Sequence, residues 1–256
     1  MASPEVRTFG DLGGLSEAAA EEIAGIAQAS VAARGRFTIA LAGGNTPRRT
    51  YEALASSFRD AIDWSRTEIL FGDERFVPHE DPRSNYKMVR EALLTRAPIP
   101  PTCVHPVPTD LPTAADAADQ YESTLRRLFA DHTTDAGGGD RVTGAAATVD
   151  LALLGVGPDG HTASLFPGSP ALDERRRWTR AVDAPQAVQP AVPRVTTTLE
   201  FLDHARAVIF LVAGEDKRRV VREILQQAPS GPVYPAALVA PRGRVLWLID
   251  RSAAPA

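Results

Sequence analysis

The feature that most constrains the fold is a series of short apolar segments separated by longer helical patterns. Six of these segments occur along the chain: Val6–Phe9, Phe37–Leu41, Ile69–Phe71, Val149–Leu154, Val208–Val212 and Val245–Ile249. Several are continuous Ile, Leu, Val and Ala, which is typical of strands buried on both faces of a parallel sheet. They therefore predict a mostly parallel central sheet.

Helical patterns lie between these strand candidates. Ser16–Arg34 begins with a serine suited to an N-cap, and Pro47–Phe58 opens with a proline in its first turn. The other candidates are Asn85–Thr95, Asp116–Ala130 and Glu215–Gln227. Alternating strands and helices predict an α/β layered fold, and the length of 256 residues suits a single domain over residues 1–256.

Within this domain, the Gly-, Thr- and Ala-rich segment 131–148 is expected to form a mobile surface loop. The single cysteine, Cys103, excludes an internal disulfide and a thiolate-rich zinc site, and we expect it to be a packing residue.

The overall charge and hydropathy exclude several classes of partner. A net charge of −4 provides no basic field for nucleic acid or an anionic membrane. No segment approaches the roughly 20 apolar residues of a membrane span, and Met1–Gly10 lacks the pattern of a signal peptide. We therefore expect a cytoplasmic protein that binds neither nucleic acid nor membrane, and we favour a monomer.

Four of the strand candidates end in a glycine-containing turn followed by polar residues. The turns are Gly43–Thr46, Gly72–Arg75, Gly155–His161 and Gly214–Lys217. In open α/β sheets, ligands bind outside the carboxyl ends of the strands. The four turns are therefore expected to converge on one site.

The first of these turns joins a strand to a helix. Gly43 and Gly44 would let the backbone approach an anion, and Asn45 and Thr46 offer side-chain donors. The helix N-terminus would add its partial positive charge. An ordinary turn that needs a positive φ is the alternative interpretation.

The third turn places Asp159 two residues before His161. A histidine there can take a proton from water near neutral pH, and a nearby carboxylate can orient its ring. The glycines could leave backbone N–H groups free for an oxyanion. A histidine that caps a helix is the alternative. The Gly-x-Gly-x-x-Gly spacing does not predict NAD binding, because a proline and a charged pair occupy the turn and no acidic residue ends a second strand about 20 residues on.

Cations accompany the other turns. Arg75 follows Asp73 and Glu74, and its guanidinium could grip a phosphate, although composition alone favours a solvated loop. Arg194 precedes a threonine run of β character. Lys217 begins a predicted helix, where it opposes the helix dipole unless an anion sits between them; a solvated lysine is the alternative.

Together these segments resemble the 6-phosphogluconolactonase family. The matching pieces, in the family's order, are Gly43–Pro47, Asp73–Pro78 with Ser84–Tyr86, Gly155–Gly168, Arg194–Thr196 and Gly214–Lys217. The resemblance implies a three-layer α/β/α sandwich similar to glucosamine-6-phosphate deaminase and ribose-5-phosphate isomerase. It also implies hydrolysis of 6-phosphoglucono-δ-lactone in the pentose phosphate pathway, without a cofactor. Asn45 departs from the serine that is common in the family.

The resemblance also suggests roles for the residues. Arg75, Arg194 and Lys217, with the amides of Gly43–Thr46, would hold the phosphate, and His161 would be the general base. Asp159 and Asp73 are both candidates to orient His161 or to bind sugar hydroxyls. No metal ligand is expected.

Two other functions remain open at this point. A glucosamine-6-phosphate deaminase shares the Gly-Gly turn and the Asp-Gly-His segment, but its pattern continues with an Asn-Glu-Pro, where this chain has Ser164–Pro167 without a carboxylate. A sugar-phosphate-binding regulator on the same fold would keep the cations and would not need His161 to titrate.

Overall fold

The computed structural model describes residues 4–131, 148–226 and 233–255. Its main sheet has six strands, and every neighbouring pair is parallel. In spatial order they are β1 (Glu5–Phe9), β9 (Arg244–Asp250), β8 (Ala207–Val212), β5 (Leu151–Leu154), β2 (Phe37–Leu41) and β3 (Thr67–Phe71). All six strands expected from the sequence belong to this sheet, so the predicted α/β fold with a parallel central sheet is confirmed.

The apolar runs form strands because the sheet buries both of their faces. Every residue of β2, β5 and β8 is buried. By contrast, β1 lies at an edge of the sheet and is largely exposed, including Val6 at 42%. Continuous burial at the centre and exposure at the edge are expected of a covered parallel sheet.

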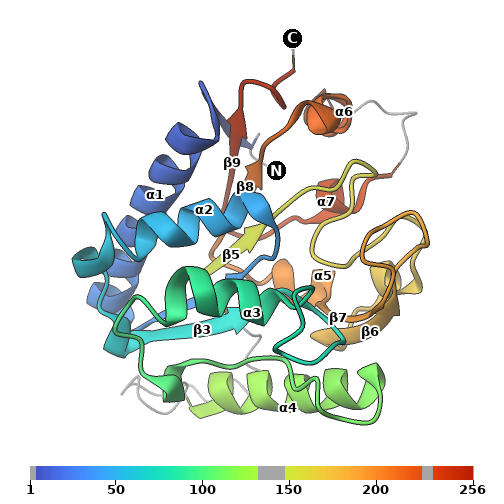
Figure 1. Ribbon diagram of the computed structural model, residues 1–256, viewed down its shortest axis with the longest axis horizontal. Helices are drawn as coiled ribbons and strands as arrows, with labels where there is room; N and C mark the ends of the chain where they lie inside the picture. Colours follow the sequence, from blue (N-terminus) through green and yellow to red (C-terminus); the bar gives the residue numbers. More distant parts are fainter. Residues whose placement is uncertain (1–3, 132–147, 227–232, 256) are drawn as a thin grey trace.

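Seven α-helices are described around the strands, together with shorter helical turns. They are α1 (Leu12–Arg34), α2 (Asn45–Leu54), α3 (Asn85–Val89), α4 (Ala114–Asp131), α5 (Leu199–Leu202), α6 (Arg218–Gln226) and α7 (Pro235–Leu238). A π-helical turn covers Arg90–Leu94, and 3₁₀ turns cover Arg59–Ala61, Trp64–Arg66, Pro101–Cys103, Pro170–Asp173 and Glu215–Lys217. Figure 1 shows α1 and α2 lying together beside the parallel strands.

Several helix boundaries differ from those predicted. α1 starts at Leu12, because Asp11 is the N-cap and accepts a hydrogen bond from the Gly14 amide (2.9 Å). The prediction of Ser16 as the cap is wrong, since Ser16 lies buried inside α1. α2 begins at Asn45 rather than Pro47 and ends at Leu54. α3 ends at Val89, and the π-helical turn follows it directly.

A second, antiparallel sheet was not predicted from the sequence. Its order is β4 (Asp73–Arg75), β7 (Pro193–Thr197) and β6 (Thr179–Asp183), and α4 packs against β6 and β7. The interpretation of residues 73–75 as a solvated loop is therefore wrong. The Gly72 carbonyl, which follows β3, accepts from both the amide and the hydroxyl of Thr197 (2.8 Å each). The second sheet is thus tied to the carboxyl edge of the first.

The opposite, amino edge of the main sheet is held by a buried carboxylate. Asp150 accepts hydrogen bonds from the amide and hydroxyl of Thr38 (2.8 and 2.9 Å) and forms ion pairs with Arg34 (2.8 Å) and Arg206 (3.4 Å). These contacts join α1 and β2 to the segments that begin β5 and β8.

The core is one contiguous cluster of buried residues drawn largely from β2, β3, β5, β8 and β9 and from α1, α2, α4 and α6, and Phe9 of β1 packs against it. Apart from its two ends, the segment expected as a surface loop, 131–148, lies outside the described residues. Among the helices that are described, none combines the length and apolar character needed to cross a membrane.

Candidate active site

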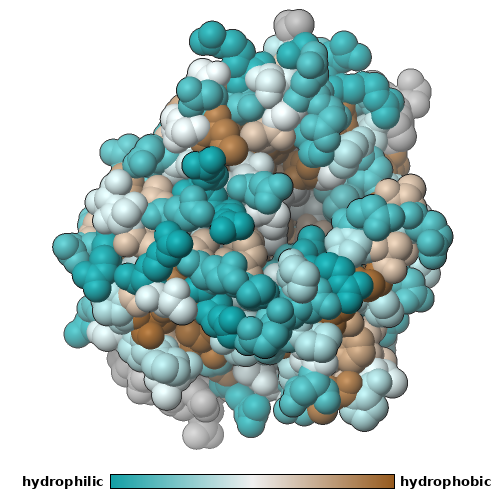
Figure 2. Space-filling view, viewed as in Figure 1, coloured by the Kyte–Doolittle hydropathy of each residue, from teal (hydrophilic) through white to brown (hydrophobic). Residues whose placement is uncertain are grey.

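The four glycine-containing turns meet at the carboxyl edge of the main sheet. They follow β8, β5, β2 and β3, which are consecutive neighbours in the sheet and run parallel. Figure 2 shows a hollow in this face of the molecule, beyond the end of β5 in Figure 1, with mostly hydrophilic residues around it. The topology of the sheet therefore brings the four turns together at one edge, as predicted.

His161 and Asp159 form a close pair in the turn after β5. The Nδ1 atom of His161 lies 2.5 Å from Oδ1 of Asp159, which also accepts from the His161 amide (3.2 Å). Burial alone would raise the pKa of Asp159, but the hydrogen bond and charge of His161 outweigh it and lower that pKa. Asp159 is therefore ionised near neutral pH, and Nδ1 must be the donor. Nε2 has no hydrogen-bond partner among the described residues.

Glycine is required at position 157 by the histidine ring itself. A Cβ there would lie 2.1 Å from Nδ1 of His161 and 2.7 Å from Oδ1 of Asp159. The Gly157 amide donates to the His161 carbonyl, and the Gly160 amide donates to the Gly157 carbonyl (2.9 Å each). Two of the three glycine amides in this turn are therefore unavailable to an oxyanion, and for these two the expectation is wrong.

Asp73 contacts a different set of residues. It is 6% exposed, and its carboxylate accepts from the Ser164 hydroxyl (2.6 Å) and the Asn85 amide (3.1 Å). Nη1 of Arg194 lies 4.0 Å away. Asp159, and not Asp73, is therefore the carboxylate that contacts His161.

Arg75 and Arg194 face each other across the second sheet. They are direct register partners in the antiparallel β4–β7 pair, so both side chains project from the same face. Arg194 is 2% exposed, and its burial, only partly opposed by Asp73, lowers its pKa. Among the described residues, the buried Nε atoms of both arginines lack a partner. Like charges placed opposite each other are unfavourable unless an anion joins them.

Each arginine is nevertheless fixed in place. Nη1 of Arg75 donates to the Arg83 carbonyl (2.7 Å), and Nη2 of Arg194 donates to the Pro190 carbonyl (2.9 Å). The Arg194 guanidinium also lies 5.5 Å from the centre of the Phe166 ring, whose centre is 5.0 Å from that of His161. Phe166 thus contacts both a cation and the histidine.

Lys217 lies in the 3₁₀ turn Glu215–Lys217, immediately before α6. Its ammonium pairs with Asp216, which relieves the conflict with the helix dipole. The position of Lys217 at the start of a helix therefore does not by itself indicate a bound phosphate. The turn is anchored where the Gly214 amide donates to Asp250 and Ser252 (3.2 Å each).

The predicted anion loop forms the start of α2. Gly44 is the N-cap, with φ of 105° and without a side-chain capping bond, and Asn45 and Thr46 are the first helical residues. Uncapped amides at a helix N-terminus can bind an anion. Gly43 is constrained in another way, because a Cβ there would lie 1.9 Å from Oδ1 of Asn85.

Sequence reasoning missed three residues of the site. Asn85 and Ser164 hold Asp73, as described above. Glu74 is 1% exposed and accepts from the backbone amides of Arg75, Asn85 and Tyr86 (2.7 Å each). The Ser84–Tyr86 segment, already noted as a family motif, was the available signal for this network. No cluster of three or more potential metal ligands occurs in the part of the chain that the structure covers.

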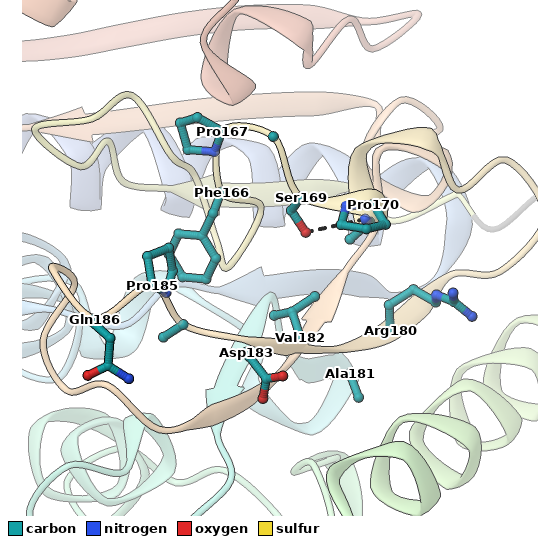
Figure 3. Close-up of a pocket in the computed structure, with 13 residues that line it drawn as sticks. Phe166, Pro167, Ser169, Pro170, Arg180, Ala181, Val182, Asp183, Pro185 and Gln186 are labelled. Carbon is teal, nitrogen blue, oxygen red and sulfur yellow. Dashed lines mark hydrogen bonds between the residues drawn. The ribbon is translucent and has the colours of Figure 1, made fainter.

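A separate cavity of about 530 Å³ lies behind Phe166. Figure 3 shows its lining, with residues 166–170 on one side and β6 with the segment that follows it on the other. None of the site residues predicted from the sequence lines this cavity. Phe166 therefore forms a wall between the cavity and His161.

The fold and the polar carboxyl edge define the class of the protein as an α/β protein with a polar site at the ends of its strands. The family model described as "Glucosamine-6-phosphate isomerases/6-phosphogluconolactonase" matches residues 11–247. The chain belongs to this family.

Individual relatives of the chain are named 6-phosphogluconolactonase. The chain is 39% identical over 224 residues to a 6-phosphogluconolactonase of Synechocystis, covering 88% of this chain and 86% of the relative. It is 38% identical over 226 residues to the human 6-phosphogluconolactonase, covering 87% and 81%.

Solved structures agree with these sequence matches. The 6-phosphogluconolactonase of Thermotoga maritima superposes with a TM-score of 0.80 at 31% identity, covering 97% of this chain and all of that one. A monomeric glucosamine-6-phosphate deaminase superposes with a TM-score of 0.77 at 20% identity, which shows a shared fold alone.

Proposed function

We propose that the chain hydrolyses 6-phosphoglucono-δ-lactone, with His161 as the general base. The observation that carries the proposal is the His161–Asp159 pair, in which Nδ1 is engaged and Nε2 has no partner among the described residues. The curated relatives named 6-phosphogluconolactonase support the choice of substrate. A cytoplasmic location and a monomeric state stay predictions from the sequence.

In the proposed reaction, Nε2 of His161 takes a proton from a water molecule as the water oxygen attacks the C1 carbonyl carbon. Asp159 stabilises the resulting imidazolium through Nδ1–H. The tetrahedral intermediate then collapses, the bond between C1 and the ring oxygen breaks, and the imidazolium returns the proton to the departing ring oxygen. The product acid ionises, so one water is consumed and the histidine is regenerated.

The phosphate anchor in this proposal consists of Arg75, Arg194, Lys217 and the first amides of α2. The facing arginines support it most directly, because a dianionic phosphate between them would satisfy their free Nε–H groups and remove the repulsion. Asp73 would hold Arg194 in position, since it contacts Arg194 and not His161.

The deaminase reaction is less well supported. It needs an additional acid–base group after the histidine, and this chain has Ser164 in that stretch. The Ser164 hydroxyl is fully buried and donates to Asp73 (2.6 Å). The site therefore offers one base for one water, which suits lactone hydrolysis.

The proposal is tested by following hydrolysis of fresh lactone beside ammonia release from glucosamine 6-phosphate, and subtracting spontaneous lactone opening. His161→Ala is expected to lower kcat by roughly 10²- to 10⁴-fold. His105→Ala is the matched control, because His105 has the same 18% exposure and pairs with Glu68 (2.7 Å) beside β3. Retention of wild-type turnover by His161→Ala, or ammonia release alone, would contradict the proposal.

A further inference from the structure

Tyr234 packs against the turn that carries His161. Gly160, the residue before the histidine, has φ of 80°, and a Cβ built on it would lie 2.2 Å from Cδ1 and 2.8 Å from Cγ of Tyr234. The tyrosine ring therefore occupies the space directly over the Gly160 backbone and leaves no room for a side chain.

The segment that contains Tyr234 also holds this turn by a backbone hydrogen bond. The Ala236 amide, in α7, donates to the Gly160 carbonyl (3.0 Å). In Figure 1 the segment that follows β5 passes next to α7. Gly160 is thus fixed by a ring on one side and by a hydrogen bond through its carbonyl.

Tyr234 is itself held from a second direction. It is 7% exposed, and its hydroxyl donates to Glu223 of α6. This hydrogen bond raises the pKa of Tyr234, so the hydroxyl stays protonated and remains a donor at neutral pH. α6 follows directly on the turn that contains Lys217. Tyr234 therefore lies between α6, which follows the Lys217 turn, and the turn that carries His161.

We propose that Tyr234 is a positioning residue that fixes the direction of the His161 ring. This rests on the proposed function, in which His161 activates water. Tyr234 acts through Gly160 and does not touch the reacting atoms. A base displaced by about 1 Å can lose on the order of 10²-fold in rate, whereas substrate held by cations elsewhere on the edge keeps its affinity. The expected signature is a fall in kcat without a matching rise in KM.

Three variants test the contact by kinetics. Tyr234→Ala removes the ring and is expected to lower kcat by roughly 10- to 100-fold, with KM within about threefold of wild type. Tyr234→Phe keeps the ring over Gly160 and is expected to restore most of the turnover. Phe58→Ala is the control, because Phe58 is a partly buried aromatic packed on the core near the Arg59–Ala61 turn. It should lower the melting temperature and leave kcat unchanged.

A second readout does not depend on activity. The proton between Nδ1 of His161 and Asp159 should give a downfield NMR signal in wild type and Tyr234→Phe, and a shifted or exchange-broadened one in Tyr234→Ala. Gly160→Ala should lower kcat in the wild-type background and should lower it less in the Tyr234→Ala background, because both substitutions affect the same contact.

These readouts separate the two proposals. If His161→Ala retains activity, the proposed function fails while the NMR signal still tests Tyr234. A folded Tyr234→Ala protein with wild-type kcat and an unchanged proton signal overturns the positioning role, as does a kcat loss matched by Phe58→Ala. If Tyr234→Ala does not fold, Tyr234→Val keeps an apolar group and removes the ring atoms over Gly160. The same fall in kcat is expected, and wild-type kcat overturns the proposal.

Discussion

At the residue scale, the two aspartates of the site are separated by their contacts. In the sequence both follow strands in polar turns, and although Asp159 lies two residues before His161, the roles of the two aspartates could not be separated. In the structure Asp159 contacts His161, whereas Asp73 lies among Ser164, Asn85 and Arg194. Only folding could decide this, because Asp73 and Ser164 are 91 residues apart in the chain.

Replacing Asp159 by asparagine should impair the base and leave substrate binding nearly intact. The amide keeps the size of the side chain but loses the charge that orients and stabilises the imidazolium, so kcat should fall by roughly 10- to 10³-fold. Steady-state kinetics on fresh lactone provide the measurement. Asp216→Asn, an exposed aspartate on the Lys217 turn, should instead act mainly on KM. An Asp159→Asn enzyme with unaltered kcat would contradict the role of the pair.

Glu74 should make stability depend on pH. Burial raises its pKa to about 7 against the opposing effect of three backbone amides. A raised carboxyl pKa means that its stabilising contribution is complete below the unfolded value and is lost as pH rises through about 7. The unfolding free energy of wild type, relative to Glu74→Gln, should therefore fall by about 2 to 3 kcal/mol between roughly pH 5 and pH 8. Denaturant titrations at both pH values measure it, and a constant difference would refute it.

At the element scale, the main sheet could be predicted and the second sheet could not. β2, β5 and β8 are apolar throughout because both faces are buried, and this pattern is visible in the sequence. β4 is only Asp73–Arg75, whose composition is that of an exposed loop. Its strand conformation depends on pairing with β7, more than 100 residues later, and local sequence carries no record of that pairing.

Helix ends show the same limit. Asp11 and Ser16 are both good N-cap residue types. The structure uses Asp11, and Ser16 donates its hydroxyl to the Leu12 carbonyl inside the helix (2.7 Å). The sequence placed the polar turns correctly where a turn directly follows a strand of the main sheet. Asn85 was missed as a site residue because it contacts Asp73 from the start of α3, 12 residues later, across a turn whose course the sequence does not reveal.

Removing one of the two facing arginine charges should relieve the electrostatic repulsion between β4 and β7. Arg75→Met abolishes the repulsion with Arg194, so unfolding free energy should change by less than about 1 kcal/mol. KM should rise about tenfold or more, with a smaller change in kcat, if Arg75 contacts the phosphate equally in ground and transition states. The rise in melting temperature produced by inorganic phosphate should shrink in the variant. An undiminished phosphate effect would remove Arg75 from the anchor.

At the scale of the whole molecule, the carboxyl and amino edges of the main sheet carry different kinds of residues. The carboxyl edge carries the polar turns, and the amino edge carries the buried Asp150 cluster. Asp150 is 3% exposed, and its ion pairs join Arg34 at the end of α1 to Arg206 just before β8. The proposed site and the buried Asp150 cluster therefore lie at opposite ends of the same strands.

Asp150→Ala should lower stability and spare catalysis. Removing the carboxylate leaves the buried Thr38 amide and hydroxyl without their acceptor, which costs about 1 to 3 kcal/mol, while the Arg34 and Arg206 side chains are 35% and 50% exposed and can be solvated. The kcat of the folded fraction should equal that of wild type. Asp60→Ala, at a carboxylate whose side chain is 94% exposed, should change stability by less than about 0.5 kcal/mol. Chemical denaturation with parallel activity measurements tests both, and a large kcat loss in Asp150→Ala would show that the edges are coupled.

The separation of these two edges has an evolutionary consequence. Substitutions in the turns can alter which reaction is performed without weakening the strand contacts that keep the chain folded, so new activities can arise at little risk to the scaffold. The family to which the chain belongs is itself described by two names, glucosamine-6-phosphate isomerases and 6-phosphogluconolactonase. A scaffold held together at one end of its strands thus leaves the turns at the other end free to vary in sequence.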